Sequence, residues 1–151
     1  MFQIAAVPPT SSELKLLVSE LDAFQEQLYP TESNHCVELT SLAEDTVRCL
    51  LVRDQKGEAV GCGAIMLQGN EAAELKRIYI KPASRGFKLG ERIVTELESV
   101  AMQAGCSTLR LETGIHQHPA IKLYQNCGYH VCEAFPPYLP DPLSVFMVKQ
   151  L

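Results

Sequence analysis

Residues 74–90, with the sequence ELKRIYIKPASRGFKLG, run from a predicted strand into a predicted helix. The first half of this stretch alternates well enough to predict a β-strand, which must end before Pro82 because proline has no amide hydrogen for a sheet ladder. Leu89 then begins an apolar stripe at three- and four-residue steps that Gly105 closes, as is typical of an amphipathic helix. The intervening residues therefore form a loop that joins a strand to a helix.

This strand-loop-helix junction is suited to binding phosphate. Backbone N–H groups and the positive end of the helix dipole favour an anion there, and Arg85 and Lys88 add cationic donors. Glycine-containing loops also precede helices without any ligand, and loop Arg or Lys side chains are usually just solvated. The segment alone leaves both readings open.

Upstream of this segment, the pattern predicts strands and helices in the first half of the chain. Thr10 and Glu13 fit a capping box that opens a helix, and Pro30 ends that helix. A second short helix is predicted over residues 34–42. Strands are predicted over residues 2–7, 47–54, 59–67 and 72–80, with turns at residues 55–58 and 68–70.

Downstream, the pattern predicts a second strand-helix unit and two final strands. The helices span residues 89–104 and 120–127, the latter capped by Gly128, and the strands span residues 108–113, 130–133 and 144–148. The sequence shows no internal repeat. Strands and helices in this order predict an α+β fold, or mixed α/β layers, and a chain of 151 residues suits one domain.

The composition narrows the class of partner. A net charge of −5 argues against a nucleic-acid or anionic-membrane surface, because either needs clustered Lys and Arg. The six cysteines show neither CxxC spacing nor a zinc-ligand rhythm, so reduced thiols and no metal are expected. With no signal peptide or long apolar run in the sequence, a cytoplasmic protein that acts on a small molecule is the simplest expectation.

With Arg85, Gly86 and Gly90, the loop resembles the acetyl-CoA loop of the GNAT superfamily, Gln/Arg-x-x-Gly-x-Gly/Ala after a central strand. Lys88 stands where that pattern has glycine, and it either crowds the phosphate or supplies an extra charge. Residues 74–82 also resemble the fourth strand of the family, and residues 120–129 resemble its late helix and the following turn. The resemblance implies one GNAT-like domain over residues 1–151, with a mostly antiparallel central sheet, a splayed parallel pair and flanking helices.

The same resemblance implies an N-acetyltransferase that binds acetyl-CoA. Pantetheine would pair with the strand that ends Ile78, Tyr79 and Ile80, and Gln117 would replace a polar amide that relatives often carry as Asn. The implied pyrophosphate loop consists of Arg85, Gly86, Phe87, Lys88, Leu89 and Gly90.

Transfer of an acetyl group to an amine needs a proton donor for the departing thiolate and a route for the amine proton. Tyr124 matches the tyrosine that the family places near the CoA sulfur, although its position in an apolar stripe also suits packing alone. Glu74 and Glu112 are the candidate bases. His116, His118 or water chains are alternatives, and a covalent acetyl group on Cys62 or Cys127 is not required.

The acceptor site is expected between two polar-aromatic loops. Tyr29, Glu32 and Tyr138 are the candidate contacts, and Glu32 or Asp141 would pair with a cationic amine. The expected acceptor is a primary amine on a small molecule or peptide, acetylated directly in a ternary complex, and a homodimer is one expected assembly. Two alternatives remain: a non-catalytic acyl-CoA-binding sensor, and a redox or metal-binding protein built on the cysteines.

Overall fold

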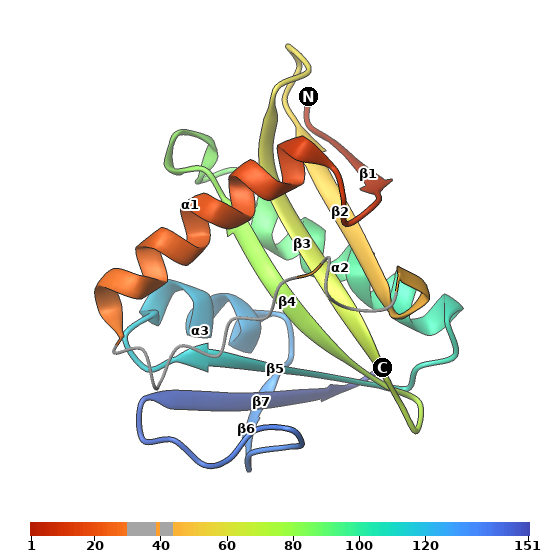
Figure 1. Ribbon diagram of the computed structural model, residues 1–151, viewed down its shortest axis with the longest axis vertical. Helices are drawn as coiled ribbons and strands as arrows, with labels where there is room; N and C mark the ends of the chain where they lie inside the picture. Colours follow the sequence, from red (N-terminus) through yellow and green to blue (C-terminus); the bar gives the residue numbers. More distant parts are fainter. Residues whose placement is uncertain (30–38, 40–43) are drawn as a thin grey trace.

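The fold is built on a mixed seven-stranded sheet with the strand order β1-β2-β3-β4-β5-β7-β6 (Figure 1). A computed structural model describes residues 1–29, 39 and 44–151. The strands are β1 (Gln3–Val7), β2 (Val47–Arg53), β3 (Ala59–Gly69), β4 (Ala72–Ile80), β5 (Thr108–Gly114), β6 (His130–Cys132) and β7 (Ser144–Gln150). The α-helices are α1 (Ser12–Leu28), α2 (Leu89–Gln103) and α3 (His118–Asn126), and the 3-10 turns are η3 (Glu44–Thr46) and η4 (Pro82–Ser84).

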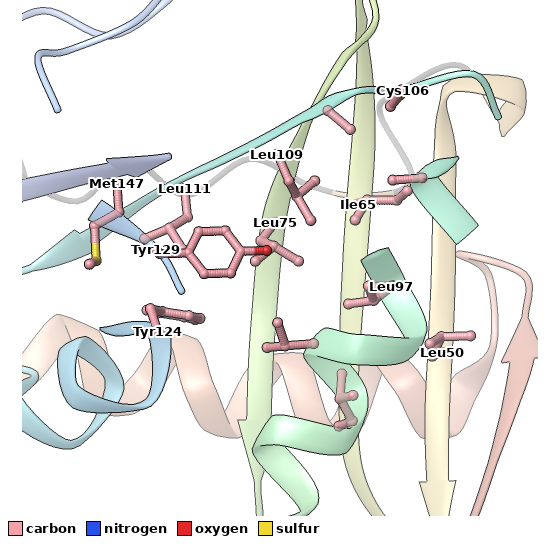
Figure 2. Packing of buried hydrophobic residues seen from close by; sticks show 14 of the residues in the cluster. Leu50, Ile65, Leu75, Leu97, Cys106, Leu109, Leu111, Tyr124, Tyr129 and Met147 are labelled. Atoms are coloured by element: carbon pink, nitrogen blue, oxygen red, sulfur yellow. The ribbon is translucent and has the colours of Figure 1, made fainter. Parts of the chain in front are cut away.

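Helices α1 and α2 cover opposite faces of the sheet (Figure 1). Strand β2 is apolar at five of its seven positions, as expected of a strand buried on both faces. Leu50 and Val52 contact the α2 side, whereas Cys49 and Leu51 contact the α1 side. The α2-side core includes Leu50, Ile65, Leu75, Leu97, Leu109, Leu111, Tyr124, Tyr129 and Met147 (Figure 2). The α1-side core consists of Leu14, Leu17, Leu39, Val47, Cys49, Leu51, Cys62 and Ala64.

Strands β4 and β5 form the splayed parallel pair. Their ladder joins Ala72 to Thr108, Ala73 to Leu109 and Glu74 to Arg110. Beyond these pairs the strands diverge, and β5 crosses away toward β7, with which it pairs along its whole length (Figure 1). Because β4 continues to Ile80 with β3 as its ladder partner, its other edge opens toward the gap.

Three local predictions are corrected by the structure. The N-cap of α1 is Ser11, whose side chain accepts a hydrogen bond from Leu14 N at 3.3 Å, so the capping box at Thr10 and Glu13 is wrong. Glu13 instead forms an ion pair with Arg53 on β2. Strand β3 also extends to residue 69, so the turn into β4 lies later than predicted, at residues 70 and 71, whose φ angles are 52° and 60°.

The third correction concerns helix α3, which begins at His118 rather than at the predicted residue 120, because a proline at its start suits the first helical turn. Of the short helix predicted over residues 34–42, only residue 39 belongs to the described part of the chain.

Candidate active site

The candidate site is a cavity of about 90 Å³ where β4 and β5 diverge. Segments distant in the sequence meet there, because the gap between the strands is closed by the end of α1 on one side and by α3 on another (Figure 1). The lining residues are Leu21, Gln25, Tyr29, Glu74, Leu75, Lys76, Arg77, Ile78, Glu112, Thr113, Gly114, Gln117, Ala120, Tyr124, Tyr138 and Leu143.

Glu74 lies on the floor of this cavity within a buried polar network. Its Oε1 accepts a hydrogen bond from Gln68 Nε2 at 3.0 Å, and its Oε2 accepts from Lys76 Nζ at 3.2 Å and from the Tyr138 hydroxyl. The side chains of Glu74 and Lys76 are only 2% and 5% exposed. A buried carboxylate and ammonium are tolerated because they pair with each other and with further hydrogen-bond partners. Both carboxylate oxygens of Glu74 are therefore already engaged.

Tyr138 closes the network from the loop before β7. Its ring packs edge-on against Phe135 at 5.3 Å, while its hydroxyl contacts both Glu74 and Lys76. Burial raises the pKa of this hydroxyl, and the Glu74 carboxylate adds to the shift, so Tyr138 stays protonated and acts as a donor to Glu74. Tyr138 therefore helps to fix the positions of the Glu74 and Lys76 side chains.

Tyr124 lies on the opposite wall, on α3. It is 7% exposed, and its ring meets the Tyr129 ring edge-on with centroids 6.0 Å apart (Figure 2). Burial raises the pKa of the Tyr124 hydroxyl, and the neighbouring Cys127 and Glu112 add to the shift. Tyr129 is itself fixed, since its hydroxyl donates to Glu98 Oε2 at 2.9 Å. Tyr124 therefore keeps its hydroxyl proton, and its ring packs against a tyrosine that is itself held by a hydrogen bond.

Glu112 lies near the end of β5, beyond the point where β5 leaves β4. Its Oε2 accepts a hydrogen bond from the Ser144 hydroxyl at 2.7 Å, across the β5–β7 pair. This partner is a neutral hydroxyl, whereas Glu74 is paired with the ammonium of Lys76. The two candidate bases thus differ in their electrostatic surroundings.

The end of α1 contributes Tyr29, which lies across the end of β5. Its hydroxyl accepts a hydrogen bond from His116 N at 3.0 Å, and its ring stacks on the His116 ring at 5.6 Å. The close approach depends on Gly114, because a Cβ atom there would lie 1.8 Å from the Tyr29 hydroxyl oxygen. Burial raises the pKa of Tyr29. Tyr29 and Tyr138, both predicted as acceptor contacts, therefore line the same cavity.

Gln117 lies between β5 and α3, at the N-cap of the helix. Its side-chain oxygen accepts a hydrogen bond from Thr113 Oγ1 at 2.6 Å, which turns the amide toward the cavity wall. The flanking His116 and His118 are exposed and are not among the lining residues. The predicted role of Gln117 near the cofactor stays compatible with its position.

The predicted pyrophosphate loop contains two residues with a left-handed backbone. Gly86 has a φ of 94° and Lys88 a φ of 58°, and Lys88 is the N-cap of α2. Lys88 thus adopts the conformation for which the family pattern has glycine, with its side chain exposed. Alternation of this kind points successive N–H groups toward one concave side, which suits an anion.

Other residues of the loop anchor it to its neighbours. Arg85 Nε donates to the Ile80 carbonyl at 2.9 Å, and its guanidinium lies over the Tyr79 ring at 5.8 Å. The exposed Phe87 packs against Phe2 of the N-terminal segment, with ring centroids 5.3 Å apart. Gly90 allows α2 to approach α3, since a Cβ there would lie 3.0 Å from Leu123 Cδ2, and Leu89 is buried beneath the loop.

The structure also places residues that the sequence analysis missed. Lys76, Arg77 and Gln25 line the cavity but were not predicted as site residues. The alternation along β4 that predicted the strand puts Lys76 on the same face as Glu74, so this signal was available for Lys76. Glu32 lies outside the described residues. Asp141 uses its Oδ1 to accept a hydrogen bond from Leu143 N at 2.8 Å, which shapes the loop beside the cavity.

The cysteines are relevant to two alternatives, a covalent acetyl-cysteine intermediate and a redox or metal-binding protein. Five cysteines of the described ranges are free thiols, and three of them, Cys49, Cys62 and Cys106, are buried. Neither Cys62 nor Cys127 is among the residues that line the cavity. Within residues 1–29, 39 and 44–151, no group of three or more potential metal ligands is found, and no helix has the length and apolar character needed to cross a membrane.

Comparison with known proteins agrees with this geometry. The chain is 42% identical over 149 residues to the IAA acetyltransferase of Azospirillum brasilense, an overlap of 98% of this chain and 97% of that protein. It superposes with a TM-score of 0.91 on a protein of Klebsiella pneumoniae assigned as an acyl-CoA N-acyltransferase, at 50% identity and with 100% and 98% of the two chains covered.

A more distant structure has the same fold. The PaiA N-acetyltransferase of Thermoplasma acidophilum, solved in complex with coenzyme A, superposes with a TM-score of 0.74 at 16% identity, over 100% of this chain and 99% of that one. A sequence model of the Acetyltransferase (GNAT) family matches residues 14–129. These matches span the strands, the loop and the helix that surround the cavity, and the chain is therefore an acyltransferase that belongs to the GNAT family of acetyltransferases.

Proposed function

We propose that this enzyme transfers the acetyl group of acetyl-CoA directly to a primary amine of a small molecule or peptide, within a ternary complex. The observation that supports the proposal best is that Tyr124, Glu74 and Glu112 all line one cavity, at the gap between β4 and β5. A proton donor and candidate proton acceptors on separate walls suit a reaction in which a thiolate leaves and an amine loses a proton.

The cofactor is proposed to lie along the open edge of β4 and to end at the start of α2. Ile78, Tyr79 and Ile80 would pair with pantetheine, and the left-handed loop with Arg85 would hold the pyrophosphate. Of the three strand residues, Ile78 lines the cavity, so the reacting end of the cofactor would lie beside it. The coenzyme A bound to the PaiA relative supports the choice of cofactor.

Tyr124 is proposed as the acid that protonates the CoA thiolate. A phenol with an ordinary pKa of about 10, raised further here by burial, holds its proton at neutral pH. Thiols have an ordinary pKa of about 8.5, so free coenzyme A is a thiol at neutral pH, and the departing sulfur has to gain a proton. The amine nitrogen gains the acetyl carbon, and the sulfur leaves with the electron pair of the thioester bond.

Glu112 is the base that we favour over Glu74. Both carboxylate oxygens of Glu74 already accept hydrogen bonds, from an amide, an ammonium and a phenol, whereas Glu112 Oε2 accepts one from the neutral hydroxyl of Ser144. Glu74 is then proposed to orient Tyr138 and Lys76 around the acceptor. Tyr29 and Tyr138 form the walls between which the acceptor lies.

The proposal is tested by incubating the protein with acetyl-CoA and a panel of amino acids, polyamines, aminoalkyl compounds and peptides. IAA is included because the Azospirillum relative is named for it. Release of free thiol that depends on the amine, together with an acetylated product detected by mass spectrometry, is the expected result. Thiol release without an amine and a stable acetyl group on the enzyme would contradict direct transfer.

The pyrophosphate assignment has its own test. Arg85→Ala should weaken coenzyme A binding about tenfold in calorimetry, because a cation beside the loop is lost. Equal affinity in the variant would remove Arg85 from the site. We also propose that residues 1–151 form one GNAT-like domain, which works in the cytoplasm without a metal. Analytical ultracentrifugation would show whether the protein forms a homodimer.

A further inference from the structure

Arg77 occupies an irregular position in β4. Its φ angle is 56°, in the left-handed region that favours glycine. At this point the register between β3 and β4 shifts, so that Arg77 and Ile78 both face the single residue Gly63. This arrangement is a β-bulge, which inserts one extra residue into a strand and redirects the side chains that follow.

The bulge reverses which side chains face the α2-side core. Ala73 and Leu75 contact this core before the bulge, whereas Ile78 and Ile80 contact it afterwards. In a regular strand, Arg77 would follow Leu75 into the same apolar layer, where a guanidinium is costly to bury. The extra residue instead allows the arginine side chain to reach the α1 face, where it is 8% exposed.

On that face Arg77 meets helix α1. Its Nε lies 3.3 Å from Asp22 Oδ1, and the Asp22 side chain is 27% exposed. The backbone of the same residue is held as well, because the Cys62 thiol donates a hydrogen bond to the Arg77 carbonyl at 3.3 Å. A strained non-glycine conformation persists only where the surroundings hold it, and here both the side chain and the carbonyl are held.

The ion pair joins two walls of the cavity. Helix α1 and its C-cap residue Tyr29 supply one side of the lining, with Leu21 and Gln25 on the helix, and β4 supplies Arg77 and its neighbours. We infer that the Asp22–Arg77 pair is a positioning device, which fixes the end of α1 that receives the acceptor against the strand that presents the acyl donor. This inference rests on the proposed function of the cavity, and it makes both residues positioning residues rather than catalytic ones.

Another ion pair between α1 and the sheet provides a matched control. Glu13 and Arg53 also join α1 to a strand, but their side chains are 43% and 37% exposed and neither lines the cavity. Exposed pairs contribute little, whereas removing one partner of a buried charge costs more. Of these two pairs, only Asp22–Arg77 should therefore matter for the acceptor.

The test compares Asp22→Asn, Arg77→Gly, the double variant and Glu13→Gln in steady-state kinetics. Asp22→Asn should raise the KM for the amine about tenfold, with kcat and coenzyme A affinity changed less than about threefold. Arg77→Gly should show the same defect, because glycine keeps the bulge while the ion pair is lost. The amine KM of the double variant should be no higher than that of either single variant. Asp22→Glu keeps the carboxylate, so its amine KM should lie close to that of the parent. Glu13→Gln should have the same amine KM as the parent.

Two results would overturn the inference. One is an unchanged amine KM in both single variants, and the other is additive defects in the double variant, which would show that the residues act separately. If the parent transfers no acetyl group, the proposed function fails, and hydrogen exchange then decides the inference by itself. Amides of residues 77–80 should exchange about tenfold faster in Asp22→Asn than in Glu13→Gln, and equal rates would refute the positioning role.

Discussion

At the scale of single residues, the Tyr124 hydroxyl gives the clearest prediction. Tyr124→Phe removes the proton donor but keeps the ring that packs on Tyr129, so kcat should fall about tenfold to a hundredfold with coenzyme A affinity unchanged. Because its pKa is raised, the hydroxyl stays protonated up to and beyond pH of about 10, and it should cause no alkaline loss of kcat below that pH. Stopped-flow assays across pH measure both effects, and full activity in the variant would exclude Tyr124 from the mechanism.

Glu74 and Lys76 give a second prediction at this scale, because one role for Glu74 is structural and the other is chemical. Glu74→Gln leaves Lys76 buried without its counter-charge, so the free energy of unfolding should fall by about 2 kcal/mol or more. Adding Lys76→Met should recover most of that loss, with kcat within about tenfold of the parent. Urea unfolding and kinetics separate the roles, since a stable but inactive double variant would make Glu74 the base.

Gly114 gives a third prediction, which concerns shape rather than charge. A Cβ in Gly114→Ala would overlap the Tyr29 ring, so the variant should lose about 1–3 kcal/mol of stability and bind the amine more weakly. Tyr29→Ala in the same chain should restore part of the stability, because the overlap is then relieved. Thermal unfolding of the single and double variants measures this coupling, and a fully stable Gly114→Ala protein would contradict it.

At the scale of elements, the start of α2 combines a strained residue with the proposed anion site. Lys88→Gly should stabilise the protein by about 1 kcal/mol, because glycine adopts the left-handed conformation without the penalty of a side chain. Lys88→Ala removes the same charge without this relief and is the matched control. Both variants should bind coenzyme A about threefold more weakly in calorimetry, whereas tighter binding by Lys88→Gly would mean that lysine crowds the phosphate.

At the scale of the whole molecule, buried thiols link stability to pH. Burial raises the pKa of Cys49 to about 11 and of Cys62 to about 12, from an ordinary value of 9.0. The stability that these protonated thiols contribute is fully present below pH 9.0. It is lost as the pH rises through the thiol pKa values of the folded protein, because the thiols of the unfolded chain ionise at lower pH. The free energy of unfolding should therefore fall above pH 9.0 by about 1.4 kcal/mol per pH unit for each thiol.

Urea unfolding between pH 8 and pH 11 tests this dependence. Cys62→Ala should reduce the slope by about one thiol's share, and the buried tyrosines, whose pKa values are also raised, should steepen it further above pH of about 10. A stability that stays constant over this range would show that the thiols ionise equally in both states.

Most of the elements, and the loop that binds the cofactor in the proposal, could be predicted from the amino-acid sequence. Apolar periodicity places β4 and α2 at the predicted residues, and the glycines at 105 and 128 lie at the helix ends with φ angles of 88° and 95°. These signals are local, because a strand or a helix end depends on residues only a few positions away. The family resemblance, through Tyr124 and the loop, then predicted the splayed parallel pair, which the structure confirms.

The different surroundings of the side chains in the cavity could not be predicted, because they depend on contacts between distant segments. Glu74 and Glu112 were equivalent candidates in the sequence, and they differ because Lys76 and Tyr138 bind one while Ser144 binds the other. The cap of α1 at Ser11 and the pairing of Asp22 with Arg77 were likewise absent from the sequence pattern. The pairing of Asp22 with Arg77 depends on the bulge in β4 and on the packing of α1 against the sheet. The spacing of apolar residues along the chain predicts neither of them.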